Sequence, residues 1–157
     1  MLIKFRIGLY AFSLVALTAW ISKYFVNIGL VPFYDLLDVP EPTPDKRYFR
    51  HIWNVLYVLL FLSFYIALVK FETLEQFYDL NTLFVSSLFV QILWTFSFFY
   101  MQMIGVSSVV IVLLDLIAVM LIHTLWGISK ASAWLFMPYL VWLFFATYLN
   151  ISIVIMN

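Results

Sequence analysis

Five separate stretches of about twenty apolar residues constrain the fold of this chain more than any other feature. They run over residues 7–26, 51–69, 80–103, 106–128 and 133–156. A helix needs about 20 apolar residues to cross a hydrocarbon core of about 30 Å. Backbone groups cannot stay unpaired in lipid, and these runs are too long and too little alternating for barrel strands. The sequence therefore predicts an all-α membrane protein, a five-transmembrane-helix bundle that forms one domain over residues 1–157.

Composition supports this fold class and excludes others. Apolar residues make up 66% of the chain and charged residues only 10%, which is too little polar material to cover a soluble protein. Eight basic and eight acidic residues leave no net charge, so a nucleic-acid partner is excluded. The chain has no Cys and only two His, and we therefore expect neither a metal site nor a cofactor. We predict a multi-pass integral membrane protein.

The connections between the stretches differ in length, and only residues 27–50 form a long loop. The loop contains Pro40, Pro42 and Pro44, which favour an extended and stiff backbone. Such a loop could cover the mouth of the bundle as a lid. On composition alone, a solvated linker is the favoured alternative.

Asp115 lies near the middle of the fourth apolar stretch. A charged side chain at that depth costs about 2.5 to 3.5 kcal/mol on the insertion scale, so we expect Asp115 to face the bundle interior. One hypothesis is a group that polarises a ligand or handles a proton. The other is a structural hydrogen bond to a neighbouring helix, and the sequence leaves both open.

The last apolar stretch carries a pattern beyond hydrophobicity. Trp142, Phe145, Ala146 and Leu149 are spaced i, i+3, i+4 and i+7, which places them on one face of a helix. The pattern P-Y-x-x-W-x-x-F-A-x-x-L-N over residues 138–150 resembles the final helix of the translocator protein family. Members of that family are also called tryptophan-rich sensory proteins or peripheral-type benzodiazepine receptors.

The second and third stretches extend this resemblance. The family element N-x-x-W-x-x-x-F-F is similar to the segment 91–99, where Gln91 replaces the asparagine. The element F-x-P-V-W-x-x-L-Y is similar to the segment 49–57, where His51 replaces the proline. The acidic residue that the family carries after the third span falls on Val110, and the first loop lacks the family's K-P-x-W-x-P-P core. The chain therefore resembles a divergent member.

The resemblance implies a pocket inside the bundle. From the residues alone, the large aromatics would mainly fill volume between helices. The resemblance instead makes them walls of a binding site, together with Asp115 as a polar group. The ligand-binding residues expected on this basis are Trp53, Tyr57, Gln91, Trp94, Phe98, Asp115, Trp142, Phe145, Ala146 and Leu149. Three basic residues at the mouth would either pair with ligand carboxylates or anchor the protein at the interface: Lys46, Arg47 and Arg50.

The function expected from this resemblance is binding of a hydrophobic planar ligand in a pocket capped by the first loop. A porphyrin or other tetrapyrrole is the favoured class, and a sterol or benzodiazepine-like compound is an alternative. Two other functions stay open: a structural or assembly subunit of a membrane complex, and a proton-coupled carrier centred on Asp115. No nucleophile or acid-base pair points to an enzyme, although the family is also linked to porphyrin breakdown. We also expect membrane lipid as a partner and a bacterial rather than an organelle membrane. The oligomeric state stays open, and a homodimer as in the family is one possibility.

Overall fold

The computed structural model describes residues 2–30 and 33–157, and it confirms the predicted fold class. Residues 31 and 32 of the predicted loop, including Pro32, lie outside the described residues. Within the described ranges, five helices are long and apolar enough to cross a membrane. They are α1 (Leu2–Gly29), α2 (Lys46–Lys70), α3 (Leu74–Thr95), α4 (Ile104–Ile128) and α5 (Lys130–Met156). A short 3-10 helix, η1 (Tyr34–Leu36), lies in the first loop, and a π-helical turn, η2 (Phe96–Tyr100), extends α3.

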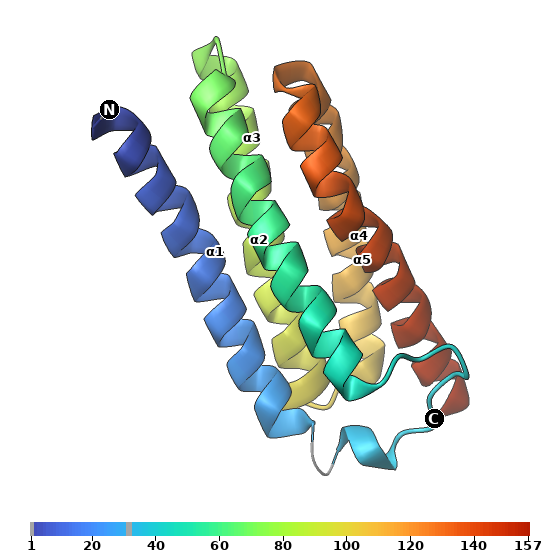
Figure 1. The fold of residues 1–157 in the computed structure, drawn as a ribbon. Helices are drawn as coiled ribbons and strands as arrows, with labels where there is room; N and C mark the ends of the chain where they lie inside the picture. Colours follow the sequence, from blue (N-terminus) through green and yellow to red (C-terminus); the bar gives the residue numbers. More distant parts are fainter. Residues whose placement is uncertain (1, 31–32) are drawn as a thin grey trace.

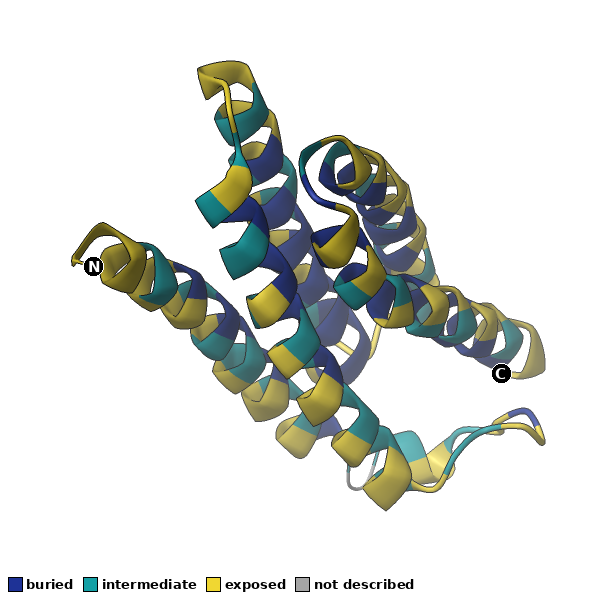
Figure 2. Ribbon diagram, turned by 45° about the horizontal axis from the view of Figure 1, so that its top comes forward, coloured by how far each residue is buried: buried dark blue, intermediate teal, exposed yellow. Residues whose placement is uncertain are grey.

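The helices pack as a closed ring. Around the ring α1 is followed by α2, α5, α4 and α3, and α3 packs against α1 again. The two termini lie at opposite ends of the bundle, and the first loop lies at the same end as the C-terminus (Figure 1). Buried residues line the inside of the ring, whereas exposed residues cover its outside (Figure 2). Many of those outer residues are large and apolar, such as Leu9, Val109 and Val141, which suits a surface that faces lipid.

The helices are longer than the predicted apolar stretches, because polar residues extend several of them beyond the hydrocarbon region. The predicted apolar stretches leave residues 70–79 between the second and third helices, but α3 already begins at Leu74. Thr73 caps this helix by accepting a hydrogen bond from the backbone nitrogen of Gln76 at 3.2 Å. Glu75 in the first turn suits the positive end of the helix dipole. Ser129 alone joins α4 to α5, since it ends one helix and caps the next.

Aromatic side chains fill the half of the bundle away from the first loop. The rings of Phe64 on α2 and Phe84 on α3 stack with centroids 3.7 Å apart. Phe136 on α5 is fully buried in the same core. These contacts close one half of the interior, so an internal cavity has room only in the half that lies under the loop.

Gly29, the last residue of α1, allows α1 to approach η2 closely. A Cβ atom at this position would lie 2.2 Å from the carbonyl oxygen of Phe99. No side chain fits at that distance, so α1 can dock against η2 only through a glycine. The contact places the end of α1 beside the aromatic residues of η2, where Phe25 and Phe96 pack with ring centroids 5.1 Å apart.

Replacing Gly29 with alanine should therefore destabilise the bundle. We expect a loss of about 1 to 3 kcal/mol, as for other substitutions that overpack a core. Gly127→Ala is the matched control, because a Cβ at Gly127 meets nothing within 4 Å. Thermal unfolding in detergent measures both variants. Equal unfolding temperatures for Gly29→Ala and Gly127→Ala would contradict this account of the contact.

Candidate ligand-binding site

A cavity of about 250 Å³ lies at the loop end of the bundle. Residues of α1, α2, α3 and α5 form its walls, and Tyr34 and Pro44 of the first loop lie over it. The loop is therefore placed as a lid rather than as a free linker. The backbone nitrogen of Asp38 donates to Oδ1 of Asn157 at 3.0 Å, and Nδ2 of Asn157 donates to the Asp38 carbonyl at 2.9 Å. This pair of bonds ties the loop to the end of α5.

Seven of the ten residues predicted for the site line this cavity. They come from α2, from α3 with its extension η2, and from α5, whose inner faces meet across the interior of the ring. The seven are Trp53, Tyr57, Gln91, Trp94, Phe98, Ala146 and Leu149. The second, third and last apolar stretches thus converge on one space, as the resemblance implied.

Trp142 and Phe145 were also expected in the pocket, but the structure places both outside the cavity lining. The face of α5 that lines the cavity consists of Ala146, Leu149, Asn150 and Ile153. Trp142 instead packs behind Phe49, with ring centroids 5.3 Å apart, and Phe145 packs against Trp142. The helical period determines which residues share a face, but packing against α2 and α4 decides how that face is turned.

Asp115, the third residue outside the lining, lies on α4. The ring places α4 between α3 and α5, and none of its residues lines the cavity. As expected, Asp115 is buried, and its Oδ2 accepts a hydrogen bond from the Thr147 hydroxyl at 2.8 Å. This bond joins α4 to α5, which favours the structural hypothesis for Asp115 over the ligand-polarising one.

Helix α1 forms a wall that the sequence analysis missed, because the resemblance covered only the second to fifth apolar stretches. The signal that could have found it is a cluster of polar residues in the last two turns of the helix: Ser22, Lys23 and Asn27. All three line the cavity, together with the apolar residues Ala19, Trp20, Val26 and Leu30.

Aromatic rings form the inner surface of the site around Trp53. Its ring lies 5.9 Å from the ring of Trp94 and 5.9 Å from that of Tyr57, with interplanar angles of 35° and 37°. Phe98 and Phe99 extend this surface toward the loop. Aromatic faces at these spacings favour the offset stacking of flat rings.

Gln91 fixes the polar end of this surface. Its Nε2 donates to the Tyr57 hydroxyl at 2.7 Å, and its Oε1 accepts a hydrogen bond from the Tyr139 hydroxyl at 2.9 Å. One amide therefore links α3 to both α2 and α5. Because both ends of the amide are bonded, Tyr57 is held in a defined position at the cavity wall.

Asn150 on α5 forms a second polar node, which meets α3 at Trp94, about one turn after Gln91. Its Oδ1 accepts a hydrogen bond from the indole Nε1 of Trp94 at 2.8 Å. Its Nδ2 donates to the hydroxyl of Ser108 on α4 at 2.7 Å. Asn150 thus orients a cavity tryptophan and joins α3, α4 and α5.

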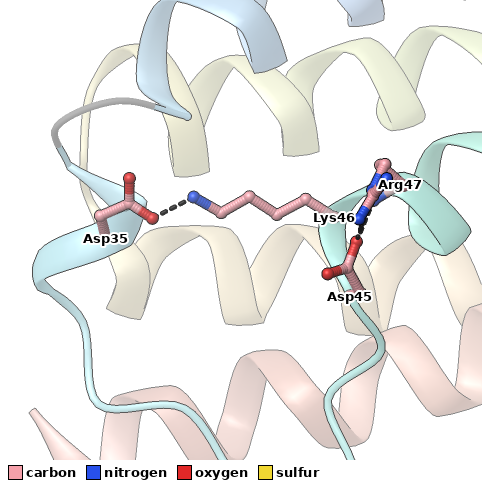
Figure 3. A network of polar contacts seen from close by, with 4 residues as sticks. All are labelled: Asp35, Asp45, Lys46 and Arg47. Carbon is pink, nitrogen blue, oxygen red and sulfur yellow. Dashed lines mark hydrogen bonds and ion pairs between the residues drawn. The ribbon is translucent and has the colours of Figure 1, made fainter.

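The mouth of the cavity is basic. Figure 3 shows Lys46 paired with Asp35, and Arg47 with Asp45, which also caps α2. Arg47 does not line the cavity, in contrast to Lys23, Lys46 and Arg50. Lys23 and Arg50 form no ion pair with any described residue. Two uncompensated cations therefore face the entrance.

Tyr34 closes the mouth from the loop side. Its ring packs against those of Phe98 and Phe99, at centroid distances of 6.3 and 6.2 Å. Burial, and to a smaller extent the neighbouring Asp35 carboxylate, raise the pKa of the Tyr34 hydroxyl. The hydroxyl therefore stays protonated and can donate a hydrogen bond.

The lining defines the chemistry that the site can support. None of the described lining residues is Asp, Glu or His. In residues 2–30 and 33–157, no three His, Asp or Glu side chains gather to hold a metal ion. The lining instead combines aromatic stacking surface, neutral hydrogen-bonding groups and cations at the entrance. This combination suits the binding of a flat, mostly apolar molecule.

Asn150→Leu should destabilise the protein by about 1 to 2 kcal/mol, because it leaves the buried Trp94 indole without its acceptor and removes the bond to Ser108. In a double-mutant cycle with Trp94→Phe, the two losses should not add, since both substitutions remove the same bond. Thermal unfolding in detergent is the measurement. Asn54→Leu is the control, because Asn54 is exposed and forms no side-chain hydrogen bond to a described residue. Additive losses in the cycle would exclude a coupled Trp94 and Asn150 pair.

Comparison with known proteins identifies similar chains over most of the sequence. Relatives include the tryptophan-rich protein TspO of Archaeoglobus fulgidus, 29% identical over 136 residues that cover 87% of each chain. The tryptophan-rich protein TspO of Bacillus cereus is 29% identical over 157 residues, covering 92% of this chain and 96% of the relative. Protein CrtK of Rhodobacter capsulatus is 31% identical over 125 residues, covering 77% and 76% of the two chains.

These relatives come from prokaryotes, which supports the expected bacterial rather than organelle membrane. The chain also matches the TspO/MBR family over residues 11–156. That match covers α1 from residue 11 onward and all of α2 to α5, and it agrees with the resemblance first found in the apolar stretches. The chain therefore belongs to the TspO/MBR family.

Proposed function

We propose that this protein binds a hydrophobic planar ligand, with a tetrapyrrole as the favoured class, in the cavity beneath the first loop. The observation that carries the proposal is the continuous aromatic surface of Tyr57, Trp53 and Trp94 inside a cavity with a basic mouth. Membership of the TspO/MBR family and the printed name "tryptophan-rich sensory protein" of the Cereibacter sphaeroides relative agree with a binding role.

The shape of the lining favours a flat ligand over a bulky one. Trp53 and Trp94 lie on different helices, yet their rings are within 35° of parallel. Because the two rings are neighbours, a planar ring system that stacks on one of them would also contact the other. Each aromatic contact of this kind contributes about 0.5 to 1.5 kcal/mol beyond area burial.

The charges at the mouth favour a ligand with an acidic edge. Lys23 and Arg50 lack an acidic partner among the described residues, whereas Lys46 is paired with Asp35. A carboxylate at the entrance would supply the missing partner. A tetrapyrrole with carboxylate side chains combines this edge with a large flat apolar body.

The cavity volume requires the loop to move for a ligand of that size. At about 250 Å³ the cavity is slightly smaller than the range of about 300 to 1,000 Å³ typical of small-molecule sites. The bonds between Asp38 and Asn157 that hold the loop lie at the exposed surface, where they break at low cost. Outward displacement of the loop would enlarge the site without disturbing the helices.

Binding of protoporphyrin IX to the detergent-solubilised protein tests the proposal. Titration followed by the Soret band should show saturable binding, and Trp53→Phe or Trp94→Phe should raise Kd about two- to tenfold through lost stacking. Trp134→Phe, on the exposed surface of α5, is the control and should leave Kd unchanged. Trp142→Phe should have a smaller effect than Trp53→Phe, because Trp142 lies behind the lining.

The absence of saturable binding by the wild-type protein would reject this function and favour the structural or assembly subunit. Equal affinities for the wild type and for both cavity variants would place the porphyrin outside this cavity. The proton-coupled carrier has a separate test, since unaltered pH-dependent uptake by Asp115→Asn would exclude it.

The role of the basic mouth can be separated from stacking by a matched pair of ligands. Arg50→Gln should raise the Kd for protoporphyrin IX up to about fivefold, the range of an exposed ion pair, but not the Kd for its dimethyl ester. Arg47→Gln is the control, because Arg47 is paired with Asp45 and lies outside the lining. An equal effect of Arg50→Gln on the acid and the ester would show that its charge does not recognise a carboxylate.

A further inference from the structure

Ser22 on α1 has an unusual position for a buried hydroxyl. The residue is only 3% exposed, and its Oγ forms no hydrogen bond with any described residue. In a helix, a serine or threonine hydroxyl commonly bonds to the carbonyl oxygen of the preceding turn. Thr18, one turn earlier on the same helix, does so with the carbonyl oxygen of Leu14 at 3.0 Å. Ser22 does not, and it lines the cavity instead.

An unpaired hydroxyl is unfavourable in a buried position. Removing a hydroxyl from water without a compensating bond carries a substantial free-energy penalty. No carboxylate lines the described part of the cavity that could accept its proton. The missing partner of Ser22 is therefore expected to come from a molecule inside the cavity.

Tyr57 places a second hydroxyl beside Ser22. The two side chains are neighbours on the walls formed by α1 and α2, and their hydroxyls lie close enough to interact, but the Ser22 Oγ does not reach hydrogen-bond geometry with Tyr57. The Tyr57 oxygen accepts a bond from Gln91, whose amide is oriented by the bond from Tyr139. The proton of the Tyr57 hydroxyl is left without an acceptor among the described residues. Ser22 and Tyr57 thus present two hydroxyl donors to the same region.

This region lies at the inner end of the cavity. Tyr57 is the lining residue of α2 farthest along the helix from the loop, and Gln91 holds the corresponding position on α3. The cations Lys46 and Arg50 lie at the opposite end, near the start of α2. A ligand that stacks on Trp53 between the two ends would present its inner edge to the hydroxyls.

We infer that Ser22 and Tyr57 form a hydrogen-bonding subsite for one acceptor atom, such as a carbonyl oxygen, on the inner edge of the ligand. This inference rests on the proposed function and narrows its ligand class. The cavity discriminates in favour of flat aromatic molecules that carry an acceptor at that edge, and against pure hydrocarbons of the same shape. Ser22, on the cavity wall formed by α1, is then a specificity-determining residue for the ligand.

A matched pair of tricyclic probes tests the subsite. Fluorene and 9-fluorenone have the same flat ring framework and differ in one carbonyl group. The dissociation constants of both are measured by tryptophan quenching for the wild type and for each variant, and the preference for fluorenone is their ratio. Because the probes partition differently into detergent, the ratio in each variant is compared with the wild-type ratio, so that partitioning cancels.

Ser22→Ala should lower the preference for fluorenone about three- to tenfold, the range of one neutral hydrogen bond. Tyr57→Phe should lower it as well, and thermal unfolding shows whether each variant is folded. Thr18→Ala is the control, because Thr18 is bonded to Leu14 and lies outside the lining. Its preference should equal that of the wild type.

The outcomes separate this inference from the proposed function. If both probes bind and the preference is the same in the wild type, Ser22→Ala and Tyr57→Phe, the subsite is wrong while binding of flat ligands stands. A fall of the same size in Thr18→Ala would also overturn the subsite, because the effect would then belong to α1 as a whole. If neither the tricyclic probes nor protoporphyrin IX bind the wild type, both proposals fail.

Discussion

The pair of hydrogen bonds formed by the Gln91 side-chain amide is the interaction on which the site depends most. Inside a membrane, a polar side chain must find its partners within the protein, because lipid offers none. Gln91 meets this requirement by donating to Tyr57 and accepting from Tyr139, so three helices are held around one amide. Removal of any member would leave buried polar groups unpaired. The geometry of the cavity wall and the packing of the ring are therefore consequences of the same set of bonds.

The bundle divides its interior into a filled half and a hollow half. Stacked phenylalanines such as Phe64 and Phe84 provide close packing away from the loop, where burial stabilises the fold. Toward the loop, larger aromatics on α2 and α3 line a space rather than fill it. Asn150 holds Trp94 in place there, and the close approach at Gly29 brings α1 against η2. The stable half thus supports a site that is organised before a ligand enters.

Sequence reasoning identified most of this site because the signals were local. Trp53 and Tyr57, or Gln91 and Trp94, lie one turn apart on single helices, and a helical pattern reports such pairs directly. Sequence reasoning missed the cavity wall formed by α1, where the signal was limited to three polar residues near the end of the helix. It also assigned Trp142 to the pocket, since a shared face does not reveal which way the helix is turned. Asp115 was correctly expected to be buried, and of the two hypotheses that the sequence left open, its bond to Thr147 outside the cavity lining favours the structural one.

By itself, the sequence determined the membrane class, the helical fold and the family, because apolar length and residue spacing are properties of single segments. The order of the helices around the ring was not determined, since the outside of each helix is as apolar as its packed side and leaves little amphipathic signal. Only the tertiary structure decided that α1 completes the cavity while α4 is excluded from it. It also placed the unpaired hydroxyl of Ser22 beside Tyr57, because that proximity arises from packing between helices and not from any spacing along the chain.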